Sequence, residues 1–211
     1  MLKGTLDTLY MEITSMIFIV ILGFFLGLFL FILSKQQNWI EKIIYTFLSI
    51  VSNILRSIPF IVLIILFIPA MSAIFGSFIG ARPAILPLAI SASPLYARMV
   101  EVAFREVDEG VLEAADAMGA SKTQKILKVL IPESLPALLS GMSITAVSVI
   151  GYTAMAAVVG GGGLGGLAIQ DGFDRNNQTV TLVATVIILI IVFILQFIGD
   201  LAVKKADKRK I

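Results

Sequence analysis

The sequence predicts an all-α membrane protein in which one domain, residues 1–211, crosses the bilayer five times. Hydrophobic residues make up 58% of the chain and charged residues 14%, with a mean hydropathy of +1.01. A soluble domain is closer to a quarter charged. Apolar runs long enough to span a bilayer, about 20 residues each, recur along the chain. Short polar segments separate them.

The apolar runs define the spans in order. The first contains no charged residue, and the second contains Pro59 and Pro69, which predict a kinked or broken helix. The third contains Pro87 and Pro94, and the fourth is rich in Ser, Thr, Ala and Gly. The predicted spans are residues 13–33, 43–75, 83–104, 138–159 and 179–203.

The two segments that flank the outermost spans carry weaker signals. Residues 1–12 lack the cleavage site of a secretory signal, so we interpret them as a short interfacial segment that is retained. Gly160–Gln178 reads as a flexible but close-packed glycine-rich loop. Its Gly161, Gly163 and Gly166 have G-x-G-x-x-G spacing, but a dinucleotide site needs a preceding strand, and a membrane span precedes this one.

The distribution of basic residues predicts the orientation, because basic loops favour the cytoplasm. An odd number of spans places the termini on opposite sides. We expect the N-terminus and residues 160–178 outside, and the C-terminus and the polar segment 105–136 inside. The inner side then collects Lys35, Lys42, Arg105, Lys122, Lys125, Lys128 and the C-terminal cluster, and the outer side only Lys3, Arg82 and Arg175.

The composition also argues against several chemistries. The chain has no cysteine and no histidine, which excludes disulfides and removes the commonest general base and metal ligand. No G-x-x-x-x-G-K-[ST] motif occurs, so we expect no ATP binding through a P-loop. The chain is predicted not to be an enzyme and to hold no cofactor, metal or nucleic acid.

Segment 105–136 predicts two short helices joined by a bend. Asp108 can cap the first helix, Gly119 can end it in a left-handed conformation, and Ser121 with Gln124 can form a capping box for the second. Pro132 is expected to end the second helix. Val111, Ala114, Ala115 and Met118 recur at helical spacing as an apolar stripe. The pattern alone fits either an insertion element for a partner protein or a plain solvated hairpin.

A family resemblance favours the first interpretation. Glu113-Ala114-Ala115, Gly119 and Ile131-Pro132 resemble the EAA loop of bacterial ABC importer permeases. Further segments resemble the methionine-uptake (MetI) type of these permeases, and together the matches cover nearly the whole chain: Asn53–Phe60, Ala97–Glu101, Gly151–Met155, Gly162–Gly165 and Gln196–Asp200. The resemblance implies the five-span MetI-like permease fold.

The resemblance also implies a function and a set of partners. A permease of this type sits in the bacterial cytoplasmic (inner) membrane as a homodimer and imports methionine. Two ATP-hydrolysing subunits, which bind ATP and magnesium, dock from the cytoplasm, and a substrate-binding protein docks from outside. The implied ATPase-coupling residues are Glu113, Ala114, Ala115, Asp116, Met118 and Gly119. Glu113 could organise the coupling helix, contact the ATPase, or be a solvated acid.

Met155 matches the methionine that closes the pathway in this type, so the resemblance implies a gate; a packing methionine is the alternative. Tyr152 and Ser148 lie one and two turns back along the same helix, where they could line the path or pack. Arg98 and Glu101 have the spacing of an ion pair. The alternatives for function are import of another amino acid or osmolyte, an ion channel or ion-coupled carrier, and a membrane scaffold.

Overall fold

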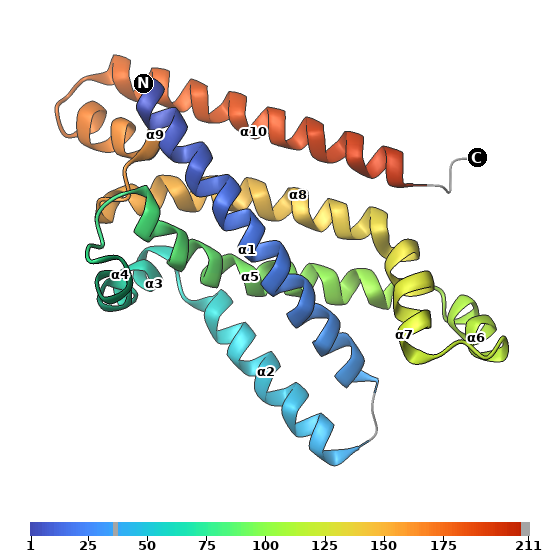
Figure 1. The fold of residues 1–211 in the computed structure, drawn as a ribbon. Helices are drawn as coiled ribbons and strands as arrows, with labels where there is room; N and C mark the ends of the chain where they lie inside the picture. Colours follow the sequence, from blue (N-terminus) through green and yellow to red (C-terminus); the bar gives the residue numbers. More distant parts are fainter. Residues whose placement is uncertain (36–37, 208–211) are drawn as a thin grey trace.

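The computed structural model describes residues 1–35 and 38–207, and within these ranges it contains helices and no strand. Figure 1 shows α5, α8 and α10 as long helices that run side by side, with α1 crossing them obliquely and α2 at the edge of the bundle. Four helical segments can cross a membrane, and the bent pair α2–α3 makes a fifth. The elements are α1 (Leu2–Ser34), α2 (Trp39–Ser57), α3 (Phe60–Leu66), α4 (Ile68–Phe75), α5 (Ala81–Arg105), α6 (Glu109–Ala117), α7 (Lys122–Lys125), η1 (Ile126–Leu130), α8 (Ile131–Ala156), η2 (Ala157–Val159), α9 (Gly163–Gly166), η3 (Leu167–Phe173) and α10 (Gln178–Ala206).

Helix α5 is the centre of the bundle, and α1 lies across it. Glycines let the two helices approach closely: a Cβ built on Gly23 would lie 2.8 Å from the carbonyl oxygen of Ser93. One on Gly27 would collide with the carbonyl oxygen of Ala97 and lie 2.7 Å from Cβ of Val100. Small residues at such contacts are the usual means by which spanning helices pack.

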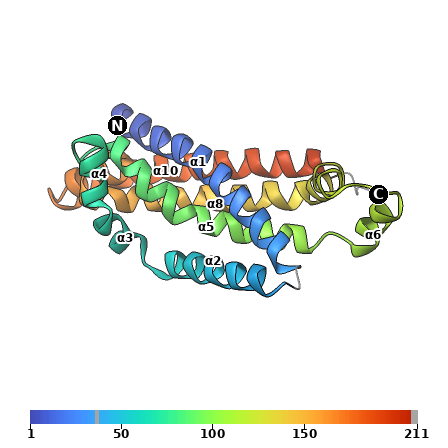
Figure 2. The same cartoon turned by 60° about the horizontal axis from the view of Figure 1, so that its bottom comes forward.

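The predicted break in the second span is confirmed. Helices α2 and α3 are bent by 105° at Ile58 and Pro59, and Figure 2 shows α3 and α4 continuing the chain at a steep angle to α2. Pro69 lies in the first turn of α4, a position where its missing N–H leaves no helical hydrogen bond unmade. Both prolines therefore end up where the chain changes direction.

Residues 1–12 are not a segment separate from the first span, because α1 begins at Leu2 and continues without a break to Ser34, and one side of its first turns is packed in the protein. The Thr8 hydroxyl accepts a 2.8 Å hydrogen bond from the backbone N–H of Leu164 in α9. Glu12 is only 2% exposed. Its two carboxylate oxygens and the Ser15 hydroxyl have no hydrogen-bond partner among the described residues. This burial depends on a distant segment, which the local pattern of charges does not reveal.

The predicted glycine-rich loop is close-packed as expected, but it is helical over residues 163–173. A Cβ on Gly165 would lie 2.6 Å from the carbonyl oxygen of Ala154, and one on Gly163 would lie 2.7 Å from the Thr8 hydroxyl. The glycines thus allow close contacts with α8 and α1. They do not make this segment an irregular loop.

The expectation that Pro132 ends a helix is also wrong. Lys122–Val159 forms one helical segment of 38 residues, because the π-helical turn η1 precedes the proline and the N–H of Ile131 donates to the carbonyl of Ile126. Pro132 then lies in the first turn of α8, where a proline is tolerated. The fourth spanning helix consequently starts inside the segment that was expected to be loop.

Candidate functional sites: the 106–125 hairpin and the open face of α8

Helices α6 and α7 form a hairpin that projects from one end of the bundle (Figure 1). The Asp108 carboxylate accepts a 2.7 Å hydrogen bond from the N–H of Gly110, as a helix cap does. Gly119 has φ of +76°. Its N–H donates to the carbonyl of Asp116, and the N–H of Ala120 donates to that of Ala115, at 2.9 and 3.0 Å. These two bonds make a Schellman turn, so the predicted stop is confirmed.

The predicted capping box starts α7. The N–H of Ser121 donates to Oε1 of Gln124 at 2.9 Å, and the N–H of Gln124 donates to Oγ of Ser121 at 3.3 Å. An ion pair then ties the two helices together, with Nζ of Lys125 2.6 Å from both carboxylate oxygens of Asp116. The hairpin therefore has fixed internal geometry at its bend and across its two helices.

The apolar stripe predicted on α6 is divided between two faces. Ala115 is 2% exposed and packs inward, whereas Val111, Ala114 and Met118 are exposed on the outer face, Met118 to 81%. An apolar face this open at the tip of a charged hairpin has no partner within the described residues. It is the surface that a second protein could cover.

The inner side of the hairpin faces a groove of about 430 Å³. Glu113 and Asp116 line it from α6, together with Lys122 and Lys125 from α7 and the apolar end of α1. A weaker ion pair, 3.4 Å between Lys35 and Glu109, joins α1 to the start of α6. Glu113 therefore lies among lysines on the groove side, whereas Met118 and Ala114 lie outside.

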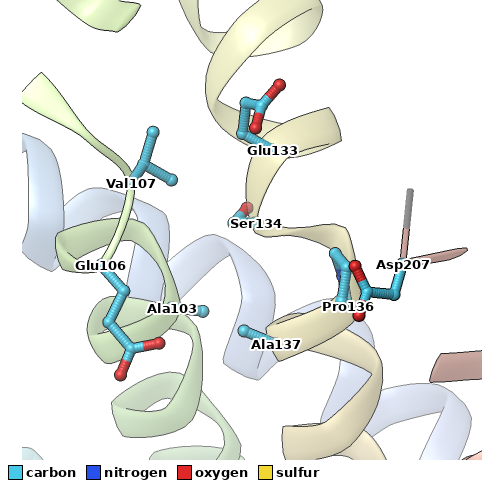
Figure 3. A pocket seen from close by; sticks show the side chains of 8 residues that line it. All are labelled: Ala103, Glu106, Val107, Glu133, Ser134, Pro136, Ala137 and Asp207. Atoms are coloured by element: carbon cyan, nitrogen blue, oxygen red, sulfur yellow. The ribbon is translucent and has the colours of Figure 1, made fainter. Parts of the chain in front are cut away.

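At the base of the hairpin, acidic residues come from three segments. Figure 3 shows Glu106 after α5, Glu133 in α8 and Asp207 after α10 around a pocket of about 140 Å³. These carboxylates are not placed as metal ligands: no group of three or more His, Cys, Asp or Glu side chains that could hold a metal ion occurs among the described residues. Sequence reasoning missed this grouping, because it depends on the ends of three helices meeting.

Helix α8 carries an open stripe of small and apolar residues. Ile144 and Met155 are 51% and 48% exposed, and Val158 in the following turn η2 is 60% exposed; Gly151 of α8 is exposed as well. Ser148 lies between them; its hydroxyl donates to the carbonyl of Ile144 at 3.0 Å and borders a cavity of about 620 Å³ between α8 and α10. Met155 is therefore about half open within this subunit.

Tyr152 lies elsewhere. Its ring stacks on Phe60 of α3, with centroids 4.9 Å apart and planes within 10° of parallel. The structure therefore brings Met155 and Ser148 to one open face, while Tyr152 packs against the break in the second span. A periodicity argument cannot separate these cases, since all three residues fall on one broad side of the helix.

The predicted pair of Arg98 and Glu101 is confirmed at 2.9 Å and belongs to a larger cluster. Glu101 is 2% exposed and also contacts Arg105 at 2.7 Å. The Tyr45 hydroxyl of α2 lies 3.4 Å from the Glu101 carboxylate. The ion pair between Glu101 and Arg105 has i, i+4 spacing and could have been found in the sequence. The contact with Tyr45 could not, because Tyr45 belongs to another helix.

Comparison with known proteins agrees with this architecture. The chain is 51% identical over 207 residues to the methionine import system permease protein MetP of Bacillus subtilis (strain 168), covering 98% of this chain and 93% of that protein. It is 41% identical over 206 residues to the probable D-methionine transport system permease protein MetI of Pasteurella multocida (strain Pm70), covering 98% and 95%.

Solved structures give the same result. A chain of the MetNI methionine ABC transporter, in an inward-facing conformation, superposes with a TM-score of 0.93 at 39% identity, covering 98% of this chain and 96% of that one. The model of a protein family described as binding-protein-dependent transport system inner membrane component matches residues 19–210. The resemblance drawn from the sequence motifs is confirmed, and the chain belongs to the family of inner-membrane components of binding-protein-dependent transport systems.

Proposed function

We propose that this chain is the permease subunit of an ATP-driven methionine importer in the bacterial cytoplasmic membrane. The observation that carries the proposal is its similarity, over 98% of its length, to permeases named for methionine or D-methionine transport. The superposition on a chain of a methionine ABC transporter supports it. Because the chain has no P-loop motif, ATP and magnesium would bind to a separate ATPase subunit.

In this proposal the hairpin transmits the motion of the ATPase. The exposed apolar face of Val111, Ala114 and Met118 would seat in the ATPase subunit. Glu113 and Asp116 would hold the hairpin's shape from the groove side, and Gly119 would set the angle of its bend. A docked hairpin with fixed internal geometry can move the bundle as a lever, since α7 is continuous with the spanning helix α8.

A second copy of the chain would complete the pathway. The open stripe of α8 and the largely exposed α10 offer apolar area without a partner among the described residues. Across a twofold axis Met155 would meet its own copy and close the path, with Ser148 beside it. A substrate-binding protein would dock at the opposite end of the bundle from the hairpin, near α4 and η3 (Figure 1).

The absence of cysteine from the sequence allows a direct test of orientation with single-cysteine variants. Met118 is 81% exposed on the hairpin and Phe173 is 78% exposed at the other end. We expect a membrane-impermeant maleimide added to intact cells or spheroplasts to label Phe173→Cys and to leave Met118→Cys unlabelled. Inside-out vesicles should give the reverse. Labelling of Met118→Cys from outside would contradict both the orientation and the proposed ATPase contact.

Transport itself is tested with the chain assembled with its ATPase and binding protein in proteoliposomes. We expect ATP-dependent accumulation of labelled methionine, and none with a non-hydrolysable ATP analogue. Competition by unlabelled amino acids and by glycine betaine identifies the substrate if it is a different amino acid or an osmolyte. Uptake that follows an ion gradient and ignores ATP would instead identify an ion-coupled carrier and refute the proposal.

A further inference from the structure

Helix α2 lines a cavity with several of its polar residues, of which Asn53 and Arg56 are still exposed in this subunit. Its outward residues are apolar: Ile43, Phe47 and Ile54 are 55%, 64% and 54% exposed. The one residue of α2 that is buried is Ser52. Polar side chains in spanning segments generally face the bundle interior or a water-filled cavity, because exposure to lipid is costly. The inner side of α2 therefore marks a polar space within the bundle.

That space is a cavity of about 390 Å³ between α2, α5 and α1. Its polar lining includes Tyr45, Ser49, Asn53 and Arg56 from α2, and Arg98 and Glu101 from α5. The volume lies within the range of small-molecule sites. Such sites combine an apolar wall with a few convergent polar groups, and Leu30 and Ile50 supply the apolar wall here.

The charges in this cavity do not balance. Glu101, the carboxylate of the lining, is already held by Arg98 at 2.9 Å and by Arg105 at 2.7 Å. Arg56 forms no ion pair within the described chain; its hydrogen bond is a long one, 3.5 Å, to the side-chain oxygen of Asn53. The site consequently has an excess of positive charge and a guanidinium with donors to spare.

The position of Arg56 in the spanning segment indicates that this excess of positive charge serves a function. It lies about 25 Å along α2 from Trp39 at 1.5 Å per residue, one residue before α2 ends and two before the 105° bend into α3 begins. Arginine inside a spanning segment is expensive and generally serves a function. Arg56 is the last residue of α2 in the cavity lining, and the bend at Ile58 and Pro59 follows just beyond it.

We propose that this cavity binds the α-carboxylate of the transported amino acid, with Arg56 as its principal ligand. A guanidinium presents two parallel N–H donors that match the two oxygens of a carboxylate. The inference rests on the proposed import of an amino acid and names the group that the permease itself recognises. A lipid phosphate shares this oxyanion chemistry, and the experiment separates the two.

The test uses the permease purified with its ATPase subunits, in detergent and without the binding protein. Equilibrium binding of labelled methionine is measured for the unmodified complex and for Arg56→Gln, Arg56→Lys and Lys42→Gln. Lys42 is on the same helix, carries the same charge and lies outside the cavity lining. We expect at least tenfold weaker binding for Arg56→Gln, an intermediate loss for Arg56→Lys and no change for Lys42→Gln. Methioninamide, which lacks the carboxylate, should not compete.

Several results would overturn the inference. One is unchanged methionine binding by Arg56→Gln; another is equal competition by methioninamide. Loss of a co-purifying phospholipid from Arg56→Gln, with methionine binding unchanged, would assign the site to a lipid phosphate. If Arg56→Gln does not assemble, Arg56→Lys decides by the same measurement. An unmodified complex that imports methionine but does not bind it saturably refutes the site alone, whereas a complex that imports no methionine refutes the proposed function.

Discussion

Replacement of Gly119 by valine is expected to reduce ATP-dependent methionine uptake at least tenfold while the protein still inserts and assembles in the membrane. Gly119 adopts φ of +76°. An L-residue pays about 1–2 kcal/mol in this region, and a β-branched residue is a genuine outlier there. A Cβ at this position would meet no atom within 4 Å. The effect therefore acts through the backbone of the bend, and crowding plays no part.

Strain at this one residue affects the whole hairpin, because the bend fixes the position of α6 relative to α7. The two Schellman hydrogen bonds, 2.9 and 3.0 Å, depend on the left-handed conformation, and Asp116 loses its alignment with Lys125 if α6 swings away. The spanning helices are outside this region, so folding should survive.

Gly119→Asn is the matched control for this prediction. Asparagine tolerates the left-handed conformation far better than valine, so this variant should retain most of the uptake. Both variants are measured in proteoliposomes beside the binding-protein-stimulated rate of ATP hydrolysis. Normal uptake by Gly119→Val would show that the geometry of the bend is not used in coupling.

The hairpin was predictable from sequence because its rules are local. Asp108, Gly119 and the Ser121–Gln124 pair each satisfy backbone groups within four residues of themselves, and the structure reproduces all three. The break at Pro59 is local in the same sense, since a proline disrupts the helix in which it occurs.

The errors have the opposite origin. The packing of Glu12 and Thr8 could not be predicted, because the contact of Thr8 with Leu164, 156 positions away, leaves no trace in the first twelve residues. The expectation that Pro132 ends a helix fails because a π-helical turn, which moves the proline into a first turn, has no simple sequence signal. For Tyr152 the sequence left lining and packing open, because its stacking partner Phe60 comes from another span.

The same distinction applies to the cavity beside Arg56. The sequence shows an arginine next to a proline break, which is consistent with a helix end or with a site. Only the tertiary structure distinguishes a helix end from a binding site, because the argument depends on Glu101 being already paired with Arg98 and Arg105. Residues that act as a group across α2 and α5 cannot be paired from periodicity alone.

Replacement of Gly27 by leucine is expected to abolish recovery of folded protein. The α1–α5 contact at this position is too close for any side chain: a built Cβ collides with the carbonyl oxygen of Ala97 and comes within 2.7 Å of Cβ of Val100. Both atoms belong to or adjoin the backbone of α5 and cannot rotate away. Overpacking by extra methylenes typically costs 1–3 kcal/mol even where side chains can shift, and here a whole helix must move.

The measurement is the yield and elution profile of a fluorescent fusion in mild detergent, followed by the midpoint of thermal aggregation. Gly27→Ala should lower the midpoint, and Gly27→Leu should leave no monodisperse peak. Gly166→Ala is the control, since Gly166 has a helical backbone and a Cβ there would meet only Cβ of Ala157, at an ordinary 3.8 Å. Its profile and midpoint should match those of the unmodified protein. A folded Gly27→Leu protein with an unchanged midpoint would mean that α1 is not held against α5 as described, and that the bundle does not depend on this contact.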